Sequence, residues 1–288
     1  MSIQFKPGFE DYVPLPRPRK YKTPVHLLPK LQQVLKVLME KGFIKHSTSP
    51  FSAPCMLVVK PHQEGVAPED LKYRLVVDLR DINQVTVPMH HRIPDISAIW
   101  SRLGDAKVIS VLDLTKGFHQ ESLNEEDGSS AKTAFSTEFG HFEFVGCVMG
   151  ARNTPVFFQS RVESALRSKG LLDVGMLRQS QDGLVEVKNS RVCCTPYIDD
   201  LVIYSDSIVE QHEEDLAKVL NCLSENRYYI EAPKCSFGCR YVSFCGGIVG
   251  NGILAMDPIK VATIQEWDRP TNATELRGFL GMANYLKP

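Results

Sequence analysis

The sequence contains no apolar run long enough to span a bilayer, which takes about 20 consecutive apolar residues in a helix. Its N-terminus lacks the charged and then apolar pattern of a secretory signal peptide. No internal repeat is visible, which argues against a solenoid of stacked units. We therefore expect an intracellular globular protein with no membrane partner.

Cysteine is present, but its spacing matches neither a disulfide framework nor a zinc site. The 8 cysteines are spread over 288 residues, and disulfide frameworks belong to short secreted chains, so we expect reduced thiols. Cys235, Cys239 and Cys245 are close enough in sequence to raise the hypothesis of a zinc site. No CxxC pair or nearby histidine completes a tetrahedral ligand set, so small, partly buried residues are the favoured interpretation.

An excess of either charge is also missing, since the formal net charge is −1. The distribution is less even: residues 1–100 hold 14 Lys and Arg against 9 Asp and Glu, and eight of the basic residues fall between Arg17 and Lys45 with only Glu40 opposing them. A basic first third beside an acidic remainder fits a phosphate-contacting surface next to a metal-binding one. An ordinary solvated basic face fits the charge pattern equally well.

The chain is long enough to bury a sizeable core, and 43% of its residues are hydrophobic. Residues 1–28 are rich in proline and basic residues and indicate an extended arm. Apolar periodicity and capping residues predict helices at Pro29–Lys41, Asp95–Leu103, Asn153–Arg167, Ser207–Asn226, after Asp257, and at Ala273–Tyr285. Strands are predicted at Met56–Lys60, Tyr73–Asp78, Lys107–Leu114 and, as a pair, within Arg191–Ser205, with hairpin material at Tyr241–Ile253. Helices and strands mix without βαβ regularity, so the fold class is α+β.

Three aspartates stand where charge is expected to be scarce. Asp113 closes an almost wholly apolar strand, and Asp199 with Asp200 interrupts an apolar hairpin. A buried charge costs several kcal/mol unless it is paired or bound to a metal. Hard oxygen ligands favour Mg²⁺, and two such ions can activate a hydroxyl and stabilise a leaving phosphate. The alternative is that the Asp-Asp pair only forms a tight turn.

The surrounding sequence resembles the reverse transcriptases of gypsy-type LTR retrotransposons, which are relatives of the retroviral enzymes. Tyr197-Ile198-Asp199-Asp200 is similar to the YxDD box of that family, and the segment from Val111 to Gln120 (VLDLTKGFHQ) is similar to its LDL…GYHQ box. Matching segments follow in order over about residues 14–286: KGFIKHSTSPFSAP at 41–54, YRLVVDLRDIN at 73–83, KTAF at 132–135, GHFEF at 140–144, NTP and FQ within 153–159, KCSF at 234–237, DPIK at 257–260 and LRGFLG at 276–281.

This resemblance implies a right-hand polymerase fold, with fingers, palm and a truncated thumb, whose antiparallel palm sheet carries the YxDD hairpin. It implies an arm at 1–28, fingers and palm at 29–247 with an insertion at about 168–190, and the start of the thumb or connection at 248–288. The reaction implied is RNA-directed DNA synthesis from dNTPs on an RNA template with a DNA primer, in the cytoplasm or a virus-like particle, or alternatively in the nucleus. Segments for RNase H and integrase are not expected here.

The resemblance also assigns roles to individual residues. Asp113, Asp199 and Asp200 hold two Mg²⁺ ions, with Mn²⁺ as an alternative, and Lys234 protonates the departing pyrophosphate. Tyr197 and Ile198 complete the YxDD box. Contacts to the incoming nucleotide come from Lys60, Arg74, Phe118, Met149, Gly150 and Gln159, where Phe118 excludes a 2′-hydroxyl. Interpretations without a functional role also remain open: solvated strand positions for Lys60 and Arg74, a core aromatic for Phe118, and a surface lysine for Lys234.

The sequence also departs from the family pattern. Val148-Met149 stands where the family has Pro-Phe before the glycine, Ala151 replaces a leucine, and Phe157 replaces a small residue. These changes leave the aspartates intact but fall near the expected nucleotide pocket. Two other functions therefore stay open: a catalytically inactive or domesticated fragment that only binds nucleic acid, and a viral RNA-dependent RNA polymerase. Phe118 and the ordered motifs argue against the second.

Overall fold

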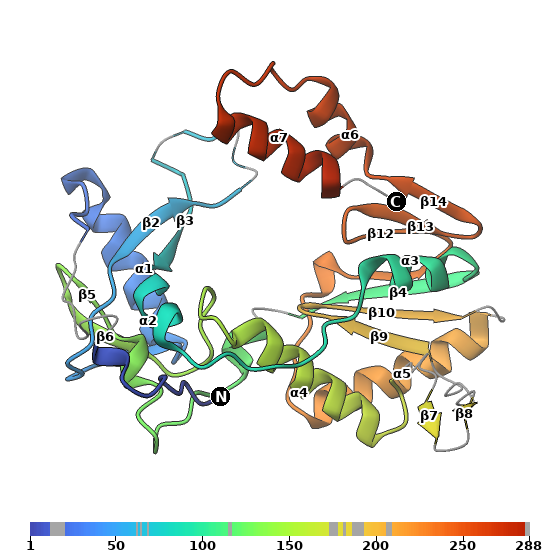
Figure 1. Cartoon of the computed structure of the whole chain (residues 1–288), viewed down its shortest axis with the longest axis horizontal. Coiled ribbons are helices and arrows are strands. Elements are labelled where there is room, and N and C mark those ends of the chain that lie inside the picture. The colour runs from blue at the N-terminus through green and yellow to red at the C-terminus, as the bar shows by residue number, and fades with distance from the viewer. Residues whose placement is uncertain are drawn as a thin grey trace. The chain divides into compact units, whose positions relative to one another are not determined.

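The computed structural model describes residues 1–11, 21–61, 63, 65–67, 69–114, 117–172, 178–180, 183–185, 193–205 and 209–285 (Figure 1). The chain forms two compact units, each discontinuous in sequence. The first contains Met1–His91 and Lys116–Phe158, and the second contains Arg92–Thr115 and Gln159–Pro288. Both units combine helices with antiparallel sheets, which confirms the α+β prediction.

The first unit contains two small sheets. A three-stranded sheet has the order β1-β6-β5, and β2 and β3 form a separate hairpin. The elements are α1 (Leu28–Glu40), β1 (Ile44–His46), β2 (Cys55–Val59), β3 (Tyr73–Val77), α2 (Arg80–Val85), β5 (Phe135–Thr137) and β6 (Gly140–Phe144), with 3-10 turns at Phe9–Asp11, Val25–Leu27, Gly117–Gln120 and Ala131–Thr133. In α1, proline in the first turn favours helix initiation, and Leu31 and Leu35 bury the apolar face.

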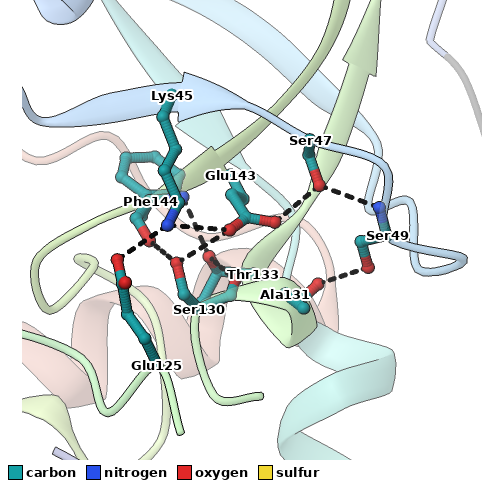
Figure 2. Close-up of polar contacts among 9 residues, drawn as sticks. All are labelled: Lys45, Ser47, Ser49, Glu125, Ser130, Ala131, Thr133, Glu143 and Phe144. Carbon is teal, nitrogen blue, oxygen red and sulfur yellow. Dashed lines mark hydrogen bonds and ion pairs between the residues drawn. The ribbon is translucent and has the colours of Figure 1, made fainter.

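One buried carboxylate joins the strands of the three-stranded sheet to the turn beside it (Figure 2). Glu143 on β6 accepts hydrogen bonds from Ser47 Oγ at 2.6 Å and Ser130 Oγ at 3.2 Å, and Lys45 Nζ lies 3.5 Å from it. Lys45 also reaches Glu125 at 2.7 Å. A carboxylate satisfied by several donors can be buried without a large desolvation penalty, so this cluster fixes β1 against β6.

The second unit is built on a four-stranded sheet of order β11-β4-β10-β9, accompanied by a three-stranded sheet β12-β13-β14. Its elements are α3 (Ile96–Gly104), β4 (Val108–Asp113), α4 (Thr154–Ser168) from Gln159 onward, β7 (Arg178–Ser180), β8 (Gly183–Val185), β9 (Cys193–Tyr197), β10 (Asp200–Ser205), α5 (Val209–Glu225), β11 (Ser236–Cys239), β12 (Val242–Phe244), β13 (Gly247–Gly250), β14 (Ile253–Met256), α6 (Pro258–Gln265) and α7 (Ala273–Tyr285). A 3-10 turn at Ala232–Lys234 precedes β11.

The core of the second unit lies between α3 and the two sheets. Ile99, Trp100 and Leu103 from α3 pack against Ile109 of β4 and Phe244 of β12 in one buried cluster. The indole N–H of Trp100 donates to the carbonyl oxygen of Phe244 at 3.1 Å, so the ring is buried with its one polar atom satisfied. This packing supports the strand that ends in Asp113.

Several sequence predictions require correction. At the start of the segment predicted as an insertion at about 168–190, Ser168 ends α4, and Leu171 and Leu172 are buried. The rest of that segment lies outside the described residues except for β7 and β8, and Ser207 is also outside them. The domain boundary predicted at 247/248 falls inside β13. The hairpin predicted at Tyr241–Ile253 is a three-stranded sheet that extends to Met256. The first residues of the predicted arm form backbone hydrogen bonds with the rest of the first unit, because Met1–Lys6 lies alongside residues 85–87 and 122–124.

Candidate active site

The β4–β10 pair brings the predicted metal ligands to one end of the four-stranded sheet. In the antiparallel register Asp200 lies directly opposite Asp113, so the two side chains emerge on the same face of the sheet. Asp199 sits one residue earlier in the turn between β9 and β10, and its carbonyl accepts the N–H of Leu114 at 2.9 Å. Two aspartates from distant parts of the chain therefore face each other, with the third beside them.

The turn that carries Asp199 has an unusual backbone. Ile198 has a φ of 55°, a region that β-branched residues rarely adopt and that costs about 1–3 kcal/mol. Gln159 from α4 spans this turn: its side-chain oxygen accepts the N–H of Ile198 at 2.7 Å, and its side-chain nitrogen donates to the carbonyl of Pro196 at 2.9 Å. The same nitrogen donates to Glu163 at 2.8 Å. Gln159 is fully buried, and these hydrogen bonds hold the turn that carries Asp199.

The three carboxylates repel one another in a partly buried setting. Burial first, and then the charges of Asp200 and Asp113, raise the pKa of Asp199 to about 6. Burial and the charge of Asp113 also raise the pKa of Asp200. Among the described residues no group donates to Asp199 Oδ1, although this atom is buried. A buried carboxylate oxygen without a donor is a position that a cation would satisfy.

Residues in the segment just before β11 also contact Asp113. Lys234 Nζ lies 3.8 Å from Asp113 Oδ1 and 2.8 Å from Glu231 Oε2, and the hydrogen bond to Glu231 raises the pKa of Lys234 above its ordinary value. The backbone N–H of Asp113 donates to Cys235 Sγ at 3.4 Å, and Glu231 N–H donates to the carbonyl of Asp113 at 2.9 Å. Lys234 is thus close enough to act on the same site, and Glu231 and Cys235 were not singled out from the sequence.

The donor set fits a hard divalent cation, but the ligands are not yet gathered around one point. Three carboxylates supply the oxygen atoms that Mg²⁺ and Mn²⁺ prefer. Within the described ranges, however, no group of three or more His, Cys, Asp or Glu side chains is arranged to hold a metal ion. The register sets Asp113 and Asp200 on one face of the sheet, and convergence of the carboxylate oxygens around a metal ion stays a prediction. The same finding gives no support to zinc at the cysteines; Cys239 Sγ instead donates to the carbonyl of Phe237.

On the other side of β4 and β10, a buried histidine was also missed. His212 of α5 is 1% exposed; its Nε2 lies 2.8 Å from Ser110 Oγ, and its Nδ1 lies 2.8 Å from Ser205 Oγ. The N–H of Gly238 donates to the same Ser110 oxygen at 3.0 Å. One imidazole therefore ties α5 to both strands that carry the aspartates and, through Ser110, to β11. A histidine on the helix face that also contains Val219 and Leu223 was the available signal.

The predicted nucleotide contacts Lys60 and Arg74 lie together in the first unit, on the β2–β3 hairpin. Arg74 pairs with Val58, and Lys60 continues the ladder by donating its N–H to the carbonyl of Lys72 at 2.9 Å. Alternation along the strands puts Lys60 and Arg74 on the same face as diagonal neighbours. Both side chains are exposed, so they are available to a phosphate.

Phe118, Met149 and Gly150 also belong to the first unit. Phe118 is 9% exposed and packs edge-on against Phe158, with 5.5 Å between ring centroids. Met149 is 61% exposed at the tip of a turn in which Ala151 N–H donates to Val148 O at 3.3 Å, and Gly150 has a φ of 93°. Positive φ at the third position of such a turn strongly favours glycine. The structure makes Met149 accessible and Phe118 largely buried.

Comparisons with known proteins agree with this arrangement. Residues 65–281 match the family model described as reverse transcriptase (RNA-dependent DNA polymerase). The chain is 34% identical over 270 residues to the retrovirus-related Pol polyprotein from transposon opus of Drosophila melanogaster, covering 93% of this chain and 24% of the relative. It is 31% identical over 269 residues to the corresponding polyprotein from transposon gypsy of the same organism, with 93% and 24% covered. The chain spans about a quarter of the length of these relatives.

Two solved structures of a foamy viral protease-reverse transcriptase resemble the chain in fold. The complex with dsDNA gives a TM-score of 0.74 at 24% identity and covers 94% of this chain and 50% of that one. The complex with an RNA/DNA hybrid gives 0.73 at 24% identity and covers 94% and 32%. This likeness confirms the predicted right-hand polymerase fold. In the part of the chain that the structure describes, no helix is both long and apolar enough to cross a membrane.

Proposed function

The chain belongs to the reverse transcriptase (RNA-dependent DNA polymerase) family, and we propose that it extends a DNA primer on an RNA or DNA template with dNTPs. The observation that carries the proposal is the β4–β10 register, which sets Asp113 opposite Asp200, beside a buried oxygen of Asp199 to which none of the described residues donates. The sequence motifs and the nucleic-acid complexes of the structural relatives support the choice of partners.

Asp113, Asp199 and Asp200 would hold the divalent cations, two Mg²⁺ ions or alternatively Mn²⁺. Reverse transcriptases as a family use divalent metal ions, and such ions lower the pKa of an attacking hydroxyl and stabilise charge on the transferred phosphate. Lys234, held by Glu231 at 2.8 Å and 3.8 Å from Asp113, is positioned to give a proton to departing pyrophosphate. Gln159 would hold the backbone of the turn from which Asp199 and Asp200 extend.

We further propose that residues of the first unit contact the incoming nucleotide. The exposed cations Lys60 and Arg74 share one face of a hairpin and would contact the triphosphate, where arginine offers a bidentate fork. Phe118 would limit space at the 2′ position of the sugar.

Primer extension on an RNA template tests the proposal directly. The wild-type chain with dNTPs and Mg²⁺ should extend the primer, and chelation of the metal should stop extension. Asp113→Asn and Asp200→Asn should each lower kcat by about a hundredfold or more, on the scale of losing one strong transition-state contact. Asp105→Asn is the matched control, because Asp105 is an exposed aspartate that ends α3 in the same unit and should retain full activity.

Two outcomes would overturn the proposal. If the folded wild-type chain extends no primer with either Mg²⁺ or Mn²⁺ but still binds the template–primer, the chain is an inactive nucleic-acid-binding fragment. If Asp105→Asn loses as much activity as Asp113→Asn, the three aspartates have no special role.

A further inference from the structure

Two asparagine side chains hold the turn that presents Met149 and Gly150 in the first unit. Asn83 of α2 donates from Nδ2 to the carbonyl of Gly150 at 2.7 Å and accepts the N–H of Arg152 at its Oδ1 at 2.8 Å. Each bond joins residues more than sixty positions apart in sequence. A side-chain amide that donates to one residue and accepts from the residue two positions later reproduces the pairing of a β-strand.

Asn153 makes the reciprocal bridge. Its Nδ2 donates to the carbonyl of Val87 at 2.8 Å, and its Oδ1 accepts the N–H of Met89 at 2.9 Å. Asn153 stands immediately before α4, where an asparagine ordinarily caps the helix with its side-chain oxygen. Here that oxygen accepts the backbone N–H of Met89. We call the four hydrogen bonds of Asn83 and Asn153 the amide latch.

The amide latch acts on a turn whose ends are anchored and whose tip is exposed. Val148 and Ala151 are 4% and 5% exposed on either side of the tip. Earlier in the same segment, Cys147 N–H donates to the carbonyl of Glu121 at 2.7 Å, and a Cβ at Gly146 would come within 2.7 Å of the carbonyl of His119. The turn is thus tied to residues 119–121 at one end and to α2 at the other, which leaves the exposed Met149 in a fixed place.

The latch also connects the turn to the strand of Arg74. α2 follows β3 after only two residues, and Ile82 and Val85 bury its inner face, so Asn83 has a fixed origin. From these contacts we propose that Asn83 and Asn153 are positioning residues for the incoming nucleotide, holding Met149 and Gly150 in register with the strand of Arg74. This inference rests on the proposed polymerase function and names no contact between either asparagine and the substrate.

Single-turnover primer extension with Asn83→Asp, Asn153→Asp and the corresponding alanine variants tests the role. Aspartate keeps the acceptor and removes the donor, whereas alanine removes both bonds without adding charge. We expect the apparent Kd for dNTP to rise about tenfold in all four variants, a loss of about 1.4 kcal/mol in nucleotide binding. The Kd for template–primer and the maximal rate should stay within about twofold. Because Asn83 and Asn153 bridge the same two segments, the double alanine variant should lose less than the sum of the single losses.

Asn226→Asp is the matched control, since Asn226 also donates its amide to a backbone carbonyl, that of Cys222 at 2.8 Å, but in the second unit. Hydrogen exchange at the Met89 and Arg152 amides measures the latch independently of activity, and both amides should exchange faster in the variants. Faster exchange with an unchanged Kd for dNTP overturns the positioning role. A wild-type chain that extends no primer removes the polymerase function and this role with it, whereas exchange still reports on the latch itself. An equal rise in Kd for dNTP in Asn226→Asp also refutes the proposal.

Discussion

Replacing Asp199 with asparagine should stabilise the metal-free protein, because the native carboxylate is held in an unfavourable place. The difference between a pKa of about 6 and the ordinary 3.8 corresponds to about 3 kcal/mol against the ionised form. The side chain is partly exposed, so solvent screening reduces this figure, and we expect Asp199→Asn to gain about 1–2 kcal/mol at pH 7.5. Removal of a functional group at a catalytic centre often raises stability in this way.

The pH dependence of the gain gives a sharper test. Between pH 3.8 and about 6 the folded state binds more protons at Asp199 than the unfolded state does, so the stability of the wild type falls as the pH rises through this window. Asp199→Asn should therefore have its full advantage in stability over the wild type above pH 6, and the two chains should be equally stable near pH 4. For a chain of this size a gain of 1 kcal/mol raises Tm by about 2–4 °C. Mg²⁺ should raise the Tm of the wild type more than that of the variant, because only the wild type has the full ligand set.

Asp78 provides a control of opposite sign in the first unit. Its hydrogen bonds from Arg80 lower the pKa of the Asp78 carboxyl to about 2, so Asp78→Asn should lower Tm at pH 7.5. Thermal melting curves of the wild type and both variants, recorded without divalent ions, measure these differences in Tm. An Asp199→Asn chain that melts at or below the wild-type temperature at pH 7.5 would refute the account of a destabilising carboxylate cluster.

Three further measurements follow from other contacts. Gln159→Ala removes both hydrogen bonds that hold the turn at Ile198, so kcat should fall about tenfold or more with little change in the Kd for template–primer. An unchanged kcat would show that the turn keeps its conformation without Gln159. Phe118→Val should lower the preference for dNTP over rNTP in kcat/KM by about tenfold, and unchanged discrimination in an active variant would make the ring core packing only. Burial lowers the pKa of His212 from 6.5, so its contribution to stability is present above pH 6.5 and is lost as the pH falls. The free energy of unfolding, measured with urea, should therefore decrease less between pH 6.5 and lower pH in His212→Gln than in the wild type. An equal decrease in both chains would contradict this account.

Local sequence signals predicted the elements that support the aspartates. The apolar run before Asp113 gave β4, the Asp-Asp pair located the turn between β9 and β10, and periodicity placed α7 at its observed limits. In these segments burial on both faces or one amphipathic face determines the structure, so a short window of residues suffices. The resemblance assigned Asp113 and Asp200 to one metal site, but the register that sets them opposite each other was not predicted, because register between distant strands is not encoded locally.

Other features depend on contacts that no local pattern reveals. The helix α2 was missed because six residues, RDINQV, offer no side-chain cap and only two buried positions. The strands β1 and β11 are short and exist because distant partners, β6 and β4, satisfy their backbone groups. The resemblance assigned Gln159 to the nucleotide pocket, and its hydrogen bonds to the backbone at Pro196 and Ile198 were not predicted.

The long sequence separation within the central sheet has a consequence for how the protein is made. β4 leaves the ribosome well before its neighbours β10 and β11: Asp113 pairs with Asp200 across 87 residues, and Val111 pairs with Ser236 across 125. Closing such long loops is entropically costly and slows folding. Until then the apolar strand has two unpaired edges, which favour aggregation. Chains that stop before β10 should therefore accumulate as aggregates, and full-length chains should depend on chaperones during synthesis.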